Sequence, residues 1–382
     1  MSHSKKLYIM DRIERREDIT VSEFVECFLE PNIPVVLGPA FTRDWAARRD
    51  WVTSSGTPDF ARLSALYPTD PVEVADCDTT YFSDHQRSTM PLPAFIEKWQ
   101  SGEHRLYCKD WHFTRSPSPY RAFSLLPHLS NDWLNAYYEE VKGDDYKFAY
   151  LGGQGTWTPF HEDVFRSYSW SANICGEKEW ILVPPGQNDL FTDVNGNWVH
   201  SLMDYDERRF PRLGELKKFK VVQGPGETMF VPSGWWHQVR NVGDTISINH
   251  NWANEFSLGR MYERLVHDLQ SVRYALSDVT GMDGFEDHVQ LVLRANSGMD
   301  FAGFLAFVEY SAGRYLQGAV AGSVDPYFLS PGSVRRALGR IDMVLELLGD
   351  DPTTVLVSGG LKDRISGLRA AIKENKKSTS PN

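Results

Sequence analysis

The sequence predicts a mainly β protein with helices, followed by an α-helical C-terminal region. Between residues 146 and 254, short runs of β-branched and aromatic residues alternate with turn residues, as in a strand-rich core. Beyond Asn254, apolar residues recur at spacings of three and four, which is the helical period. These patterns divide the chain into N-terminal helices and strands at 1–145, a β core at 146–254, α-helices at 255–375 and a disordered tail at 376–382.

The N-terminal part is expected to contain two helices and three strands. An amphipathic pattern at 21–29 stops before Pro31, and a second one at 92–100 is followed by Gly102. The predicted strands of this part lie at 33–38, 72–75 and 106–112.

Within the core, the segment 167–175 alternates between small polar and larger residues. Because successive side chains of a strand point to opposite faces, one face should be polar and line a pocket. The polar positions of this face are Ser167, Ser169, Ser171 and Asn173. Further strands are expected near 148–152, 178–183, 219–223, 228–231 and 245–251.

The segment 187–219 is polar and poorly periodic, with a charged cluster at 204–209. We expect a long insert over the mouth of the barrel, where loops often carry binding residues. A plain solvated surface is the alternative explanation for its charges.

Four helices are predicted after the core from apolar residues at helical spacing. The helices are marked by Met261 to Leu276, Phe301 to Val308, Val334 to Leu348 and Leu361 to Ile372. This region is either a docking or dimer module or a bundle that buries one edge of the barrel. The sequence does not specify an oligomeric state.

Composition limits the classes of partner. The formal net charge of −11 disfavours non-specific binding to nucleic acid. The four cysteines have no Cys-x-x-Cys spacing, so neither a structural zinc site nor a disulfide framework is indicated. With no apolar signal core and no run of 18 apolar residues, we expect a cytoplasmic or nuclear location and no membrane partner.

A candidate metal site comes from three residues. His161 and Asp163 are two apart, so on an extended strand both would leave the same face. His237 follows a Pro-Ser-Gly bend and begins another predicted strand. Two histidines and one carboxylate with open positions form the facial triad of non-haem Fe(II) oxygenases. Lys178, at the start of a mostly apolar strand, needs an anionic partner, which a dicarboxylate co-substrate would supply.

Together these motifs resemble the JmjC (jumonji C) family of Fe(II)- and 2-oxoglutarate-dependent oxygenases of the cupin superfamily. The matching features are Thr158-x-x-His161-x-Asp163, Gly176-x-Lys178-x-Trp180 and Val231-Pro-Ser-Gly-Trp-Trp-His237 followed by Thr245-Ile-Ser-Ile-Asn249-His-Asn251. The amino-acid sequences of the segments 157–173 and 107–112 are most similar to the jumonji-domain-containing protein 4 subfamily. The resemblance covers residues 20 to 255 and implies a double-stranded β-helix (cupin or jelly-roll) core.

The resemblance also implies cofactors and site residues. Fe(II) would be held by His161, Asp163 and His237, with 2-oxoglutarate and O₂ at the open positions. Lys178 would pair with the distal carboxylate of 2-oxoglutarate, assisted by the hydroxyl of Thr158. The remaining candidates for the cofactor pocket are Tyr107, Asn249, Asn251, Ser171 and Asn173. Tyr107 could equally pack in the barrel wall, and relatives carry Asn at the position of Ser171.

The subfamily resemblance implies a protein hydroxylase that acts on a lysine side-chain carbon of the translation termination (release) factor. An acidic enzyme suits a lysine-bearing substrate. Two alternatives stay open: a histone Nε-methyl-lysine demethylase, which would share the iron site, and a catalytically inert JmjC-fold binding module.

Overall fold

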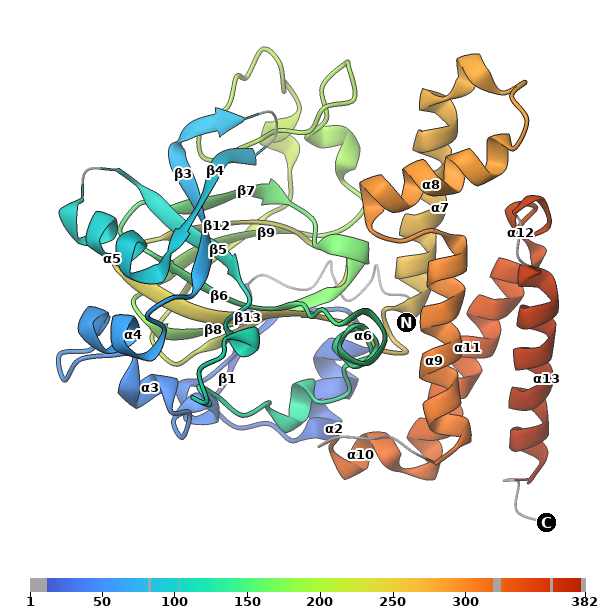
Figure 1. Cartoon of the computed structure of the whole chain (residues 1–382), viewed down its shortest axis with the longest axis horizontal. Helices are drawn as coiled ribbons and strands as arrows, with labels where there is room; N and C mark the ends of the chain where they lie inside the picture. The colour runs from blue at the N-terminus through green and yellow to red at the C-terminus, as the bar shows by residue number, and fades with distance from the viewer. Residues whose placement is uncertain (1–11, 82–83, 103, 319–323, 358–359, 379–382) are drawn as a thin grey trace. The chain divides into compact units, whose positions relative to one another are not determined.

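The computed structural model describes residues 12–81, 84–102, 104–318, 324–357 and 360–378 (Figure 1). The chain forms two compact units. The β unit comprises the described parts of Met1–Leu126, Asp145–Asp163 and Tyr168–Asn251. The helical unit comprises those of Pro127–Asp144, Val164–Ser167 and Trp252–Asn382.

The β unit contains a nine-stranded and a four-stranded sheet. The strand order of the larger sheet is β1-β2-β11-β8-β13-β6-β5-β3-β4, and that of the smaller is β10-β9-β12-β7. The strands are β1 (Glu14–Arg16), β2 (Val35–Leu37), β3 (Pro71–Tyr81), β4 (Asp84–Pro91), β5 (Leu106–Trp111), β6 (Lys147–Gly152), β7 (Trp157–His161), β8 (Tyr168–Cys175), β9 (Lys178–Val183), β10 (Phe219–Gln223), β11 (Thr228–Val231), β12 (Trp236–Asn241) and β13 (Thr245–Trp252).

The eight strands β6 to β13 supply four strands to each sheet, and Figure 1 shows the two sets stacked. This arrangement confirms the predicted double-stranded β-helix. Its interior is filled by side chains that alternate along the strands, so Trp180 and Leu182 of β9 pack inward against Met229 and Val231 of β11. The strand β4 was not predicted from the sequence, because its solvent-facing residues hide the alternation.

Short helices surround the sheets of the β unit. They are α2 (Val21–Phe24), which continues as a π-helix (Val25–Leu29), α3 (Ala47–Asp50), α4 (Phe60–Leu66) and α5 (Leu92–Ser101), with 3-10 turns at Pro39–Thr42, Phe113–Arg115, Asn188–Leu190 and Leu213–Glu215. The first helix begins at a capping box, in which Thr20 and Glu23 each satisfy a backbone N–H of the other. The helix α5 ends at Gly102, whose φ of 66° is favourable for glycine.

The insert between β9 and β10 differs from its prediction as a polar loop over the barrel mouth. Its apolar residues are buried on the outer face of the four-stranded sheet, against Phe160, Ile181, Val183 and Trp236. These buried residues are Phe191, Val199, Leu202, Phe210, Leu213 and Leu216. Because they are spaced irregularly between charged residues, no period revealed them. The segment therefore contributes to a core, while its charges lie in solvent.

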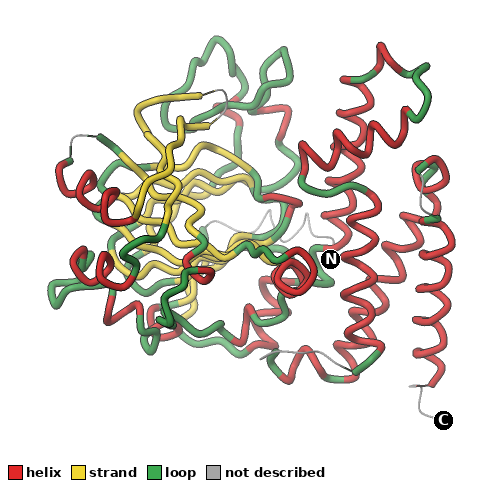
Figure 2. Tube along the Cα trace, viewed as in Figure 1, coloured by secondary structure: helices red, strands yellow, loops and turns green. Residues whose placement is uncertain are grey.

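The helical unit contains α6 (Trp133–Tyr137), which continues as a π-helix (Tyr138–Lys142), α7 (Leu258–Ala275), α8 (Phe285–Ser297), α9 (Phe301–Leu316), α10 (Pro326–Leu329), α11 (Pro331–Asp350), α12 (Thr353–Leu356) and α13 (Leu361–Ser378), with 3-10 turns at Pro127–Leu129, Val164–Arg166 and Ser277–Val279. Figure 2 shows this unit as almost entirely helical, with α9, α11 and α13 in mutual contact.

The start of α11 and the end of α13 can be related to particular residues of the sequence. The helix α11 begins at Ser330, whose hydroxyl accepts the N–H of Ser333, and it buries an apolar stripe that includes Leu338, Ile341 and Leu345. The helix α13 extends to Ser378, so residues 376–378, predicted as a tail, are helical. Lys376 lies 3.7 Å from Asp342 of α11, a contact that favours the last turn. Residues 379–382 of the predicted tail lie outside the described residues.

In the described part of the chain no helix by itself has the length and apolarity to span a bilayer, although α8 and α9, joined at a 67° bend, reach both thresholds as a pair. All four cysteines are free, and only Cys27 is exposed.

Candidate metal centre

The pairing of β7 with β12 brings the two predicted histidine ligands together. His237 lies directly opposite His161 in the antiparallel register, and their ring centroids are 4.3 Å apart. Asp163 lies beyond the end of β7, so the prediction that it shares a strand face with His161 is wrong. The chain leaves the strand after His161, yet the carboxylate still approaches both rings. One potential ligand atom from each of the three residues lies within 4.8 Å of the others, a spacing that could hold one metal ion.

Backbone carbonyl groups fix the orientation of both imidazole rings. His161 Nδ1 lies 2.7 Å from the carbonyl oxygen of Pro159, and His237 Nδ1 lies 3.2 Å from that of Trp235. A ring that donates its Nδ1–H to a carbonyl keeps its Nε2 lone pair for a metal. Burial, and then the neighbouring His237, lower the pKa of His161 to about 4. His161 is therefore neutral near pH 7, as metal binding requires.

The carboxylate of Asp163 is also held on both of its oxygens. The hydroxyl of Ser169 donates to Oδ2 at 2.7 Å, and the side-chain amide of Asn251 donates to Oδ1 at 2.9 Å. Such bonds restrict a carboxylate to one orientation and leave its remaining lone pairs for a metal. Ser169 and Asn251 thus belong to the support of this centre.

A buried lysine lies in the same pocket. Lys178 is 2 % exposed, and its Nζ donates to Ser247 Oγ at 2.6 Å and to Tyr107 Oη at 3.5 Å. Among the described residues no carboxylate forms an ion pair with it. Burial accordingly lowers the pKa of Lys178 to about 7. An ammonium group whose hydrogen-bond partners among the described residues are hydroxyls has the chemistry of a site for a carboxylate ligand.

Most of the other predicted pocket residues line this cavity. Tyr107, Thr158, Ser171, Asn249 and Asn251 surround it together with the three metal-ligand candidates and Lys178. The hydroxyl of Ser171 and the side-chain oxygen of Asn249 are buried and have no hydrogen-bond partner in the described structure. Buried polar atoms without partners are uncommon, so both atoms are available to a ligand in the cavity.

The comparison with known proteins agrees with this site. Residues 21–258 match the model of the cupin-like domain family, which covers both metal strands and the lysine strand. The chain therefore belongs to the cupin-like domain family.

Similar proteins extend over most of the chain. The 2-oxoglutarate and iron-dependent oxygenase JMJD4 of Danio rerio is 39% identical over an alignment of 315 positions, which covers 79% of this chain and 74% of the relative. The human protein of the same name is 38% identical over an alignment of 371 positions, which covers 92% of this chain and 89% of the relative. These relatives show that the chain belongs to the JmjC 2-oxoglutarate and iron-dependent oxygenases. An arginine-specific demethylase of Arabidopsis thaliana, JMJ20, is 39% identical over an alignment of 327 positions, which covers 79% of this chain and 71% of the relative.

One predicted pocket residue of this oxygenase lies elsewhere. Asn173 is fully buried and does not line the cavity; its side-chain amide donates to the carbonyl oxygens of Gly176 and Gln223. It therefore fixes the turn after β8. The alternation of the segment 167–175 placed Asn173 on the correct face, but strand period cannot tell how far along that face the cavity reaches.

Some residues of the site were missed from the sequence, among them Ser247 and Tyr150. Ser247 accepts the hydrogen bond of Lys178, and it shares a strand face with Asn249 and Asn251, so the period-2 signal could have identified it. Tyr150 lines the cavity and donates its hydroxyl to Asp110 at 2.5 Å. No local pattern marks Tyr150, because its position depends on the pairing of β6 with β13 and β5.

Proposed function

We propose that this chain is an Fe(II)- and 2-oxoglutarate-dependent protein hydroxylase that modifies a lysine side-chain carbon of the translation termination (release) factor. The observation that carries the cofactor assignment is the buried Lys178, which forms no ion pair with a described carboxylate and lies in the same cavity as the His161, Asp163 and His237 group. A metal site alone is common to many cupin-like proteins. The lysine adds a requirement for a ligand with a carboxylate.

The donor set fits iron. Two neutral imidazoles and one carboxylate with open coordination positions are typical of non-haem Fe(II) oxygenases. His161 and His237 would bind the ion through Nε2, and Asp163 through the lone pairs that Ser169 and Asn251 leave available. When bound, iron, 2-oxoglutarate and dioxygen supply the oxidising chemistry, with succinate and CO₂ as co-products.

The residues of the chain would position 2-oxoglutarate and shield the metal centre from water. Lys178 would hold the distal carboxylate of 2-oxoglutarate, and the hydroxyls of Thr158 and Tyr107 would donate to the same group. The free polar atoms of Ser171 and Asn249 face the space left for the rest of the co-substrate. The buried walls of the barrel exclude water from that space.

The choice of substrate rests on the similarity to JMJD4 proteins and on charge. A chain with a net charge of −11 suits a lysine-bearing polypeptide. The test is to incubate the protein with intact release factor, Fe(II) and 2-oxoglutarate and to map modified peptides by mass spectrometry. A +16 Da lysine that requires both cofactors is expected, and its absence from an Asp163→Ala control completes the assignment. Unmodified release factor would refute the proposed substrate.

Demethylation is the second candidate, because a relative of equal identity carries the name arginine-specific demethylase. A demethylase releases formaldehyde and leaves a product 14 Da lighter, whereas a hydroxylase leaves one 16 Da heavier. Assays on methyl-arginine and Nε-methyl-lysine peptides with formaldehyde detection separate these activities. An inert binding module would show neither product, nor any turnover of 2-oxoglutarate in the absence of substrate.

A further inference from the structure

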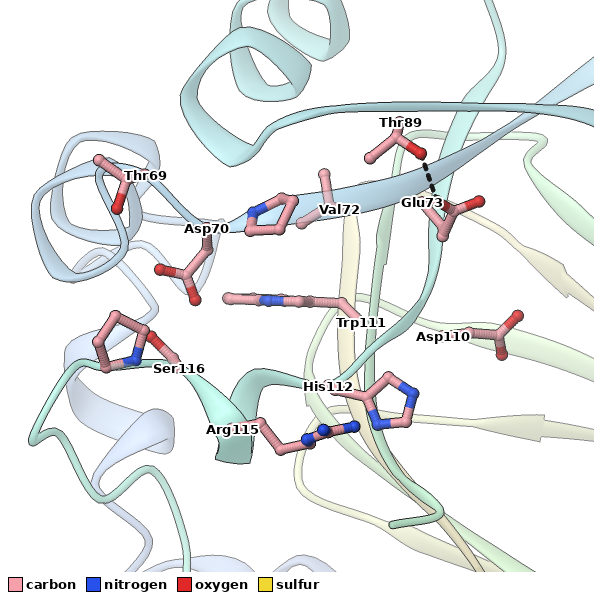
Figure 3. A pocket seen from close by; sticks show the side chains of 12 residues that line it. Thr69, Asp70, Val72, Glu73, Thr89, Asp110, Trp111, His112, Arg115 and Ser116 are labelled. Atoms are coloured by element: carbon pink, nitrogen blue, oxygen red, sulfur yellow. Dashed lines mark hydrogen bonds between the residues drawn. The ribbon is translucent and has the colours of Figure 1, made fainter. Parts of the chain in front are cut away.

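A second cavity of the β unit lies outside the metal centre. Its volume is about 460 Å³, and it lies between the start of β3, the end of β5 and the turn that follows β5 (Figure 3). We call this cavity the β3–β5 groove. Its lining residues include Asp70, Pro71, Val72, Glu73 and Trp111.

The carboxylate of Asp70 is the unusual feature of the groove. Asp70 is only 4 % exposed, and among the described residues its side chain forms no hydrogen bond or ion pair. Figure 3 shows this carboxylate directed into the groove beside the indole of Trp111. Its oxygens are not among the fully buried polar atoms, so they face the open space of the groove and are available to a ligand there. Its position therefore points to a cationic ligand that completes the site.

The other charges of the groove leave it acidic. Glu73 accepts a hydrogen bond from the hydroxyl of Thr89 at 2.5 Å and has no cationic partner in the described part of the chain. Asp110 is neutralised by Arg87 at 2.6 Å, and its carboxylate points away from the groove. The guanidinium of Arg115 extends away from Asp70. Two carboxylates without a cation, Asp70 and Glu73, thus remain for a ligand.

The remaining walls specify the shape of the ligand. Trp111, Pro71 and Val72 provide an aromatic and aliphatic surface next to the carboxylates. A lysine or arginine side chain has an apolar stem that packs on such a surface and a charged end that an indole face attracts. Of the described lining residues, His112 belongs to a group of potential metal ligands with Asp144 and Asp145, but Asp70 and Glu73 do not. These two carboxylates therefore suit an organic cation better than a metal ion.

We propose that the β3–β5 groove binds a lysine or arginine side chain of the polypeptide substrate, at a distance from the residue that is modified. The inference rests on the proposed function for its choice of a polypeptide. The strand β5 joins the two sites, because Tyr107 lines the metal-centre cavity and Trp111 lines the groove. An extended segment covers about 3.3 Å per residue, so a peptide that occupied both sites would need at least about four residues between them.

The test uses a fluorescent hexalysine amide, with its fully Nε-acetylated form as the neutral control, and measures binding to the whole protein at 0.15 M salt. Asp70→Asn is compared with Asp44→Asn, which removes the same charge from a side chain that is 91% exposed. We expect Asp70→Asn to weaken the binding of hexalysine at least about tenfold, because a charge-assisted hydrogen bond is lost. Asp44→Asn should change this affinity less than about twofold. Equal affinities of the two variants would overturn the proposal.

A second measurement covers the case in which Asp70→Asn does not fold. Carbodiimide coupling of hexalysine to the unsubstituted protein, mapped by mass spectrometry, should form amide bonds at Asp70 or Glu73, and Glu73→Gln should remove part of them. Coupling only at other carboxylates refutes the site, and preferential binding of free spermine refutes a polypeptide ligand. Because neither measurement involves turnover, failure of release-factor hydroxylation would leave their outcome intact and refute only the proposed function.

Discussion

Replacement of Lys178 by methionine tests the co-substrate site most directly. Burial lowers the pKa of this lysine from 10.5 to about 7. At pH 8, Lys178 is protonated in the unfolded chain but mostly deprotonated in the folded protein without ligand. Releasing this proton on folding lowers the free energy of unfolding by about 3 kcal/mol, at about 1.36 kcal/mol per pH unit between pH 8 and the unfolded pKa. Lys178→Met removes this cost and leaves the Ser247 hydroxyl without its donor, a penalty of about 1–3 kcal/mol.

We therefore expect the free energy of unfolding of Lys178→Met without ligand to be unchanged or as much as about 2 kcal/mol higher. The affinity for 2-oxoglutarate should fall by about 30-fold to several thousand-fold, because breaking a buried charge pair costs about 2–5 kcal/mol. Urea unfolding measures the first quantity, and calorimetric titration of 2-oxoglutarate in the presence of Mn(II) measures the second.

Lys220→Met is the matched control, because Lys220 is an exposed lysine on the neighbouring strand β10. It should change neither quantity appreciably. The reasoning would be refuted if Lys178→Met bound 2-oxoglutarate as tightly as the unsubstituted protein, or if it unfolded several kcal/mol more easily, since Lys178 would then have a structural role.

The other predictions concern pH, the metal ligand and the insert. The pKa of Lys178 is depressed in the folded protein, so its unfavourable contribution is complete below pH 7 and disappears as the pH rises to 10.5; stability without ligand should increase across this window, and Lys178→Met should lose that increase. Over the same window, 2-oxoglutarate affinity should fall by up to about tenfold per pH unit, because binding requires proton uptake by the lysine; a flat titration profile would contradict the assignment. Asn251→Ala should weaken iron binding by about 10- to 100-fold in a chelator competition, since Asp163 loses its amide donor. Phe210→Ala should cost about 3–5 kcal/mol in urea unfolding with iron affinity unchanged, and a cost below 1 kcal/mol would show that the insert is not part of a core.

Several features of this chain could be predicted from local patterns. The period-2 alternation of the segment 167–175 and of the segment 245–251 gave the strands β8 and β13, and helical spacing gave α7, α9, α11 and α13. The residue types of the metal-ligand candidates and of Lys178 indicated their chemistry. Each of these signals depends on neighbours a few residues apart, so no knowledge of the fold was needed.

Other features depend on contacts between distant segments. The sequence contains no sign that Asn251 would hold Asp163, 88 residues away, or that Tyr150 would reach Asp110. The insert was misjudged for the same reason, because its irregularly spaced apolar residues acquire a meaning only against the outer face of β7, β9 and β12.

The amino-acid sequence by itself determined the strand and helix types, the ligand chemistry and the need of Lys178 for an anion. Only the tertiary structure decided that His237 pairs with His161 across two strands, that Asp163 leaves the strand, and that Asp70 is almost fully buried beside a groove. The physical reason is that strand alternation and helical spacing are patterns among residues two to four positions apart. Strand register and side-chain burial instead depend on sheet pairing between residues far apart in the chain.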